Sequence, residues 1–240
     1  MTDATATLPK LWVERLGVVE SLKPVSIVRD VKLHPGLNLV WAKEPEGAMG
    51  AHIRERGGHG VGKSTFCLML RAVLGDDGKA VKAMRGQLAG EMPDGGVGAV
   101  VHIGEETHSV FRPFASEGFT VEGDNIAALL NGADHSAFRN YLSVLSANML
   151  SSLKQRSIPG TDQYIEWQHL LSWATRDQGT RLRTYYDWRT DGSGLRRANQ
   201  DPPLLVRSAL GLMATEEAAA VRELQDVKNQ IEQGATVLKQ

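Results

Sequence analysis

One segment of the chain has the residue types and spacing of a phosphate-binding loop: Gly57-Gly58-His59-Gly60-Val61-Gly62-Lys63-Ser64-Thr65. It fits the pattern G-x-x-x-x-G-K-[ST], in which glycines let the backbone curl until several N–H groups point at one phosphate. In this pattern Lys63 reaches the β- and γ-phosphates, and the Ser64 hydroxyl binds Mg²⁺. The segment predicts binding of a nucleoside triphosphate. The sequence has no Asn-Lys-x-Asp base-reading motif, which favours ATP over GTP.

Such a loop has to be positioned by a strand before it and a helix after it. Gly36–Trp41 has the apolar character of a strand, and residues 64–74 have the pattern of a helix whose positive N-terminal end would face the anion. Between that strand and the loop, residues 44–56 are too long for a tight turn and predict an inserted surface segment. Its His52, Arg54 and Arg56 either contact phosphate or base, or stay solvated.

Composition sets limits on the partners. The chain has 240 residues, 42% of them hydrophobic and 23% charged, as in ordinary globular proteins. Because the formal net charge is −1, any contact with DNA has to come from a local patch. The single cysteine, Cys67, lies between Phe66 and Leu68 and is expected to be a small buried apolar residue. We see no secretory signal and no apolar stretch long enough to span a bilayer, so we expect a cytoplasmic protein without a membrane partner.

The other strand patterns fall before and after the loop. Residues 10–19 and 25–33 predict two strands, and Gly96–Ile103 and Thr107–Pro113 predict a β-hairpin around Gly104-Glu105-Glu106. A second interpretation makes residues 100–106 a Walker B strand, with Glu105 or Glu106 as Mg²⁺ ligand or base. His102 interrupts that apolar run and Gly104 separates it from the glutamates, which favours the hairpin.

Helical patterns dominate the second half of the chain. They cover residues 79–88, 124–131, 133–155, 163–174, 204–212 and 215–239. Residues 176–189 mix arginines with aromatic residues, a composition typical of nucleic-acid surfaces or of a packed lobe surface. In the last helix, the spacing of Leu224, Val227, Ile231 and Leu238 indicates the start of a coiled coil.

In this order, the pieces resemble the N-terminal half of an ABC-type ATPase head. The family comprises the structural-maintenance-of-chromosomes (SMC) and double-strand-break-repair ATPases, with RecN and RecF as relatives. The resemblance is carried by Pro35-Gly36-Leu37-Asn38, by Gly60–Thr65, and by a short apolar helix leading into a long charged one. The sequence departs from the family pattern at His59, where asparagine is usual, and at the insertion of residues 44–56.

This resemblance implies an α/β fold of the P-loop NTPase class. Residues 1–200 would form a head lobe with a mixed sheet around the P-loop helix, and residues 201–240 a helical exit into the coiled coil. The family uses a glutamine to bind Mg²⁺ and the attacking water. Gln178 is the preferred candidate, ahead of Gln163 and Gln168, which would make Lys63 and Gln178 the catalytic residues.

The resemblance also implies partners. Members of the family use a Leu-Ser-Gly-Gly signature, and this sequence has none, so another polypeptide segment would have to supply it. A C-terminal half of the same head would supply the missing motifs, and a second head would complete an ATP-dependent homodimer. DNA, with nuclease or accessory subunits, would be the further partners, in chromosome maintenance, repair or defence against foreign DNA. Two rivals remain: a P-loop small-molecule kinase, and an interaction module that binds ATP without hydrolysing it.

Overall fold

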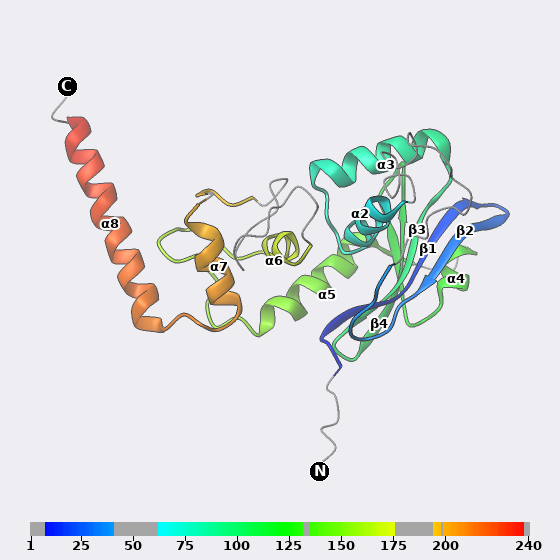
Figure 1. Ribbon diagram of the computed structural model, residues 1–240, viewed down its shortest axis with the longest axis horizontal. Helices are drawn as coiled ribbons and strands as arrows, with labels where there is room; N and C mark the ends of the chain where they lie inside the picture. The colour runs from blue at the N-terminus through cyan, green and yellow to red at the C-terminus, as the bar shows by residue number, and fades with distance from the viewer. Residues whose placement is uncertain (1–7, 41–61, 132–134, 176–193, 198, 238–240) are drawn as a thin grey trace, which may run out of the picture. The chain divides into compact units, whose positions relative to one another are not determined.

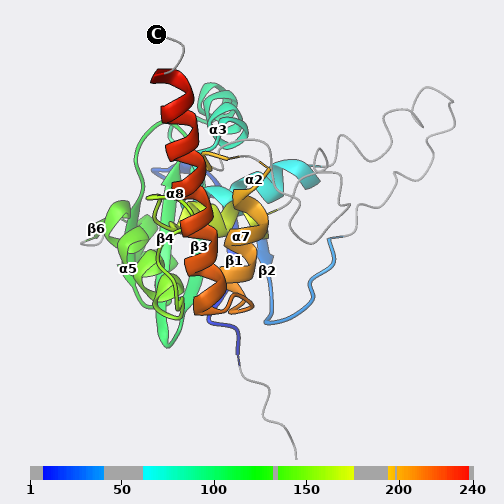
Figure 2. The same cartoon turned by 90° about the vertical axis from the view of Figure 1, so that its left-hand side faces the viewer.

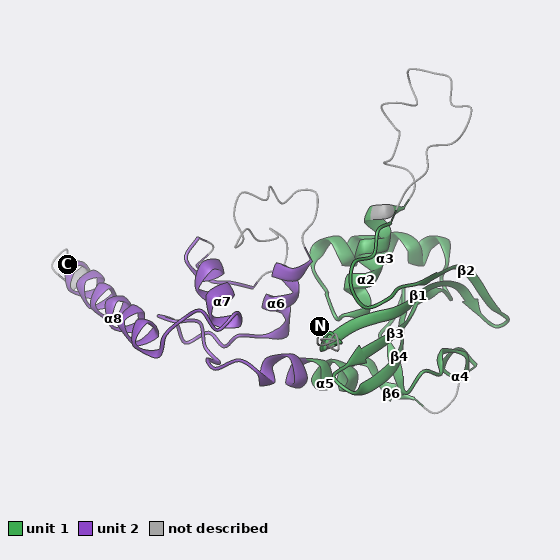
Figure 3. Ribbon diagram, turned by 60° about the horizontal axis from the view of Figure 1, so that its bottom comes forward, with its two compact units in different colours: residues 1–145 green, residues 146–240 purple. Residues whose placement is uncertain are grey.

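The computed structural model describes residues 8–40, 62–131, 135–175, 194–197 and 199–237. The chain divides into two compact units, residues 1–145 and 146–240, each of which is described by itself (Figure 3). The predicted division at residue 200 separates a nucleotide-binding lobe from a helical exit, which is a division by function and not by compactness. It stays a prediction.

Unit 1 is built on a six-stranded sheet in the order β2-β1-β3-β4-β5-β6. The strands are β1 (Leu11–Leu22), β2 (Val25–Lys32), β3 (Gly96–Ile103), β4 (Glu106–Pro113), β5 (Phe119–Glu122) and β6 (Ser136–Ala137). Every pairing among these strands is antiparallel. The expected α/β composition is confirmed, whereas the expectation of a mixed sheet is wrong for the described strands.

The hairpin prediction for β3 and β4 is confirmed. Ile103 pairs with Glu106, so Gly104 and Glu105 form a two-residue turn, and Gly104 has the positive φ of 62° that such turns require. The Walker B interpretation is therefore wrong for this segment, because Glu105 lies in the turn and Glu106 begins the returning strand.

Helices cover both faces of the sheet (Figure 1). They are α2 (Lys63–Val73), α3 (Lys79–Glu91), α4 (Ile126–Leu130) and the start of α5 (Phe138–Ser151). Neighbouring residues of β3 point to opposite faces. A Cβ on Gly98 would meet Ile126 of α4 at 3.0 Å, while Val97 pairs with Arg112, which contacts Asp77 of the α2–α3 loop. Helix α4 therefore packs on one face, and α2 and α3 on the other.

One strand prediction for unit 1 fails and one strand was missed, and both outcomes depend on pairing, because a strand is stable only where a neighbour satisfies its N–H and C=O groups. The strand expected at Gly36–Trp41 is absent from its described part, residues 36–40, where Leu37 and Leu39 are 78% and 85% exposed. None of the described strands pairs with this segment, and the outer edge of β2 has no neighbour among them. The short strand β5, by contrast, was not predicted and forms because β4 offers it a free edge.

Unit 2 contains the end of α5 and the helices α6 (Trp167–Ala174), α7 (Asp201–Ala209) and α8 (Thr215–Val237), the last of which is drawn in red and faces the viewer in Figure 2. Its core joins Leu153, Ile158, Ile165 and Leu205. Helix α7 begins earlier than predicted, because prolines are tolerated in the first helical turn, where Pro202 and Pro203 lie. Among the residues described, no helix is long and apolar enough to cross a membrane.

Candidate nucleotide-binding site

The described part of the candidate site is the N-terminal end of α2. Gly62 precedes the helix with φ 79° and ψ 10°, a left-handed conformation that glycine adopts without strain. The first intrahelical hydrogen bond runs from the N–H of Phe66 to the carbonyl of Gly62 at 2.8 Å. The N–H groups of Lys63, Ser64 and Thr65 therefore precede the intrahelical ladder and lie at the positive end of the helix dipole.

The electrostatics of this helix end suit an anion. No side chain caps the helix, and its first turn carries no acidic residue. The Ser64 side chain is exposed, as a ligand to Mg²⁺ would have to be before the ion binds. A helix N-terminus of this kind binds phosphate through its backbone N–H groups.

The structure describes only some of the predicted site residues. It describes Gly62, Ser64 and Thr65 and the backbone of Lys63, which are consecutive at the start of α2. Gln178, the insertion with its His52, Arg54 and Arg56, the segment 176–189, and the loop residues Gly57, Gly58, His59, Gly60 and Val61 lie outside the described residues. The assignment of all these residues to one site stays a prediction.

The far end of α2 is anchored by a buried ion pair that sequence reasoning missed. The Nε of Arg71 donates to the Asp76 carboxylate at 2.7 Å, and the two side chains are 4% and 1% exposed. The other carboxylate oxygen of Asp76 accepts from the N–H of Gly78 at 2.7 Å. Together with the buried Met69, Ala72 and Val73, this pair fixes the helix that would present the phosphate loop.

Cys67 is exposed, which corrects the prediction of a buried residue. The buried face of α2 carries Met69, Ala72 and Val73. At about 100° per residue, Cys67 points to the opposite side of the helix from that face. Its apolar neighbours in sequence, Phe66 and Leu68, indicated burial, but the helical period decides the matter.

A compact turn at residues 34–38 gives Asn38 a structural role. Its side-chain amide donates to the carbonyls of His34 at 2.8 Å and Gly36 at 3.2 Å, and its Oδ1 accepts from the N–H of His34 at 3.1 Å. Gly36 adopts φ 111°, which favours glycine. The segment Pro35-Gly36-Leu37-Asn38 therefore encodes a turn closed by its own asparagine.

The two rival glutamines for Mg²⁺ both lie in unit 2. Gln163 donates from Nε2 to the carbonyl of Gly194 at 2.7 Å and accepts at Oε1 from the N–H of Arg196 at 3.3 Å. Its amide thereby ties the 157–163 loop to residues 194–196. Gln168 is half-buried on α6. The contacts of Gln163 describe a structural role and leave the assignment of Gln178 as a prediction.

The two hairpin glutamates, Glu105 and Glu106, belong to no cluster of metal-binding side chains among the described residues. Glu106 contacts the Nε2 of the buried His108 at 3.2 Å. Within the described ranges, no group of three or more His, Cys, Asp or Glu side chains could hold a metal ion.

In comparisons with known proteins, no family model, no curated protein and no solved structure matches this chain. The site is interpreted from its own residues and geometry.

Proposed function

We propose that this chain is the ATP-binding half of an SMC-like ATPase head, whose ATP-dependent engagement with a second head acts on DNA. The observation that carries the proposal is a complete G-x-x-x-x-G-K-[ST] segment that leads into α2, an anchored helix with an uncapped and acid-free first turn. The sequence pattern supports the binding of a nucleoside triphosphate, and the open N-terminal end of α2 supports the binding of an anion.

Each predicted site residue has a distinct role in this proposal. The loop N–H groups of Gly57–Gly62 and the Lys63 ammonium hold the β- and γ-phosphates of ATP. The hydroxyl of Ser64 and the amide oxygen of Gln178 bind Mg²⁺, and Gln178 also orients the attacking water. An acid that activates this water and a signature motif that closes over the γ-phosphate would come from other polypeptide segments.

Two exposed apolar features support a partner that completes the head. Leu37 and Leu39 are 78% and 85% exposed in the segment after β2, outside the sheet. Leu224, Val227 and Ile231 are 56%, 46% and 65% exposed along α8. Apolar side chains gathered at such spacing usually meet a partner surface. We infer that a C-terminal half covers both features.

The biological setting follows from the resemblance alone. ATP would join two heads in a homodimer, and the opening and closing of this dimer would move the coiled coils and the DNA they hold. Nuclease or accessory subunits would join in repair or in defence against foreign DNA. A cytoplasmic location fits this setting.

Phosphate release by the chain alone and by the chain joined to its C-terminal half tests the proposal. The lone chain should bind ATP weakly and turn it over negligibly, since each missing electrostatic group accounts for roughly 10²–10³ in rate. The completed head should hydrolyse ATP, with a rate per protein that rises as the protein concentration rises, because two heads must meet.

Robust release by the lone chain, first order in protein, would contradict the half-head assignment. Transfer of phosphate to a small-molecule acceptor by the lone chain would instead favour a kinase. ATP binding with no turnover by the completed protein would favour a non-hydrolysing module.

A further inference from the structure

Among the described residues, helix α8 meets the rest of unit 2 along one face, where a Cβ on Gly160 would lie 3.2 Å from the carbonyl oxygen of Val221. Ala218 is its one buried residue among those whose side chains are described, at 9% exposed. Near its start, the guanidinium of Arg207 binds both carboxylate oxygens of Glu217 at 2.6 Å each. A bidentate pair of this kind fixes geometry as well as charge. This contact holds the first turn of α8 to α7.

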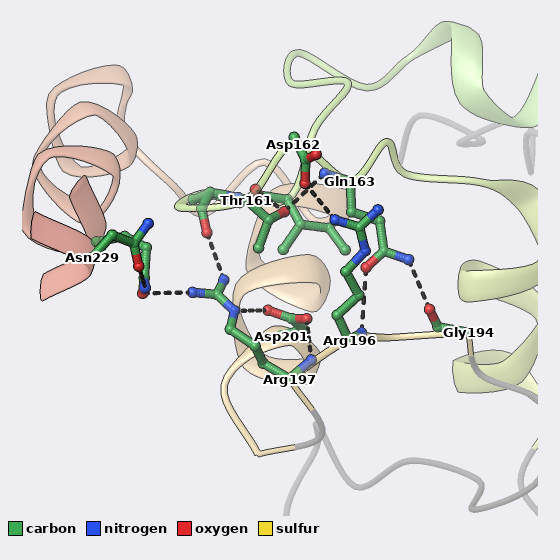
Figure 4. A network of polar contacts seen from close by, with 11 residues as sticks. Thr161, Asp162, Gln163, Gly194, Arg196, Arg197, Asp201 and Asn229 are labelled. Carbon is green, nitrogen blue, oxygen red and sulfur yellow. Dashed lines mark hydrogen bonds and ion pairs between the residues drawn. The ribbon is translucent and has the colours of Figure 1, made fainter. Parts of the chain in front are cut away.

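Two turns further along, α8 makes a second contact, with Arg197 (Figure 4). The Nη1 of Arg197 donates to Oε1 of Gln225 at 3.1 Å. The same side chain donates from Nε to Asp201 at 2.7 Å and from Nη2 to the carbonyl of Pro159 at 2.9 Å. Asp201 is fully buried, so Arg197 is fastened to the core of unit 2 whether or not Gln225 is present.

The space beneath this contact is polar and open to solvent. A cavity of about 440 Å³ lies between the 160–162 loop and α8, lined by groups such as Thr161, Asp162, Arg222 and Asp226. Water in this cavity can take the place of Gln225 at the Nη1 of Arg197, because a bridging water is nearly equivalent to a direct hydrogen bond. Opening the outer contact therefore costs only the net free energy of one hydrogen bond, roughly a fivefold change in population.

We propose that α8 is a hinged arm held by a latch, the Arg197–Gln225 hydrogen bond. The inner contact, Arg207–Glu217, lies beside the connection that precedes α8, where a rotation of the helix moves it little, whereas the latch lies two turns further out and is separated by a small rotation. The latch is thus the first contact to break, and α8 then swings about the 210–214 connection, where Gly211 has φ 67°.

The latch lies on a different face of α8 from its exposed apolar residues. At about 100° per residue, Ala218 and Gln225 share one face of the helix, and Leu224, Val227 and Ile231 are turned away from Gln225 by about 100–160°. A partner helix could therefore pair with the apolar face in either state of the latch, and the latch would set the angle at which the pair leaves unit 2. This device needs no nucleotide, so it stands apart from the proposed function.

Distance measurements between two spin labels test the latch in the full chain. The labels would be placed by Tyr164→Cys in the 157–166 region and Gln230→Cys on α8, both at exposed positions, after Cys67→Ser removes the native thiol. With the latch intact we expect one narrow distance distribution. Gln225→Ala should broaden it or add a second population, by roughly a fivefold shift toward the open arm, the weight of one hydrogen bond.

Gln233→Ala is the matched control, because Gln233 is an exposed glutamine two turns further along the same helix. It should leave the distribution unchanged, and circular dichroism should show equal helix content in all variants. An unchanged distribution in Gln225→Ala, an equal change in Gln233→Ala, or a loss of helix content in place of a swing would each overturn the proposal.

Discussion

Arg71 and Asp76 form an ion pair at 2.7 Å inside unit 1, with side chains 4% and 1% exposed. The pair joins the last turn of α2 to the loop that begins α3. Buried charges of this kind tolerate the loss of a partner poorly, because the remaining charge stays desolvated. The helix that would present the phosphate loop therefore depends on a contact far from the phosphates.

Asp76→Ala should lower the free energy of unfolding of unit 1 by about 3–5 kcal/mol, since it removes the carboxylate that compensates the buried Arg71 guanidinium. Urea denaturation measures this loss. Asp30→Ala is the matched control. Asp30 pairs with Arg15 at a similar distance, 2.8 Å, but the two side chains are 33% and 36% exposed. It should cost no more than about 1 kcal/mol. Equal losses in the two variants would contradict the role given to burial.

Gly62→Ala should destabilise the protein by about 1–2 kcal/mol, because an L side chain is strained at φ 79° even where space is open. Gly86→Ala tests the opposite sign. Gly86 lies within α3 with nothing near its would-be Cβ, so alanine should stabilise the protein by roughly 0.5–1 kcal/mol. Thermal melts of both variants decide the matter, and a Gly62→Ala protein as stable as the parent would refute the strained conformation.

Acid should weaken unit 2 through His169. Burial lowers the pKa of His169 below its ordinary value of 6.5, and the carboxylates of Glu166 and Asp201 oppose this only in part. As the pH falls through that ordinary value, the unfolded chain takes up the proton first. Stability is therefore complete above about pH 6.5 and is lost as the pH falls through the lowered pKa of the folded state.

Proton uptake at Nδ1 of His169 would also break the bond that this nitrogen accepts from the N–H of Glu166 at 2.9 Å. His169→Gln keeps an acceptor at this capping position without titrating. Melting temperatures of the parent and of His169→Gln, compared between about pH 7.5 and about pH 5, should converge at the acidic end or cross there. Parallel pH profiles would exclude His169 as the source of the slope.

Substitutions of Gln163 and Gln178 should cause different defects, one in stability and the other in turnover. Gln163→Ala removes the hydrogen bonds to Gly194 and Arg196 and should destabilise unit 2 by about 1–2 kcal/mol. Gln178→Ala should leave melting unchanged and reduce Mg²⁺-dependent turnover of a completed head more than ATP binding. If Gln163→Ala abolishes turnover at full stability while Gln178→Ala does not, the glutamine assignment is wrong.

Local signals in the sequence predicted those parts of the fold that local interactions determine. The β3–β4 hairpin follows from Gly104 between two apolar runs, and α2 follows from its helical period after Lys63. The strand expected at Gly36–Trp41 failed because pairing depends on a neighbour that the segment itself does not encode. The short strand β5 was missed because four residues carry little periodicity.

The candidate site divides in the same way. Its phosphate-loop residues follow from a fixed pattern, and the structure adds the left-handed Gly62 and the open first turn of α2. The exposure of Cys67 and the turn-closing role of Asn38 depend on which face of a helix is buried and on which carbonyls lie within reach. Residue type alone predicts neither the exposure of Cys67 nor the role of Asn38.

Titration of the chain with labelled ATP and Mg²⁺, for the parent, Lys63→Ala and Lys79→Ala, tests the central claim most directly. Lys79 is an exposed lysine at the start of α3 and serves as the matched loss of one charge. We predict that the parent and Lys79→Ala bind ATP equally. Lys63→Ala should lose about 1.5–3 kcal/mol of binding free energy or more, at an unchanged melting temperature. ATP binding by Lys63→Ala with the affinity of the parent, or no binding by the parent, would contradict the nucleotide assignment.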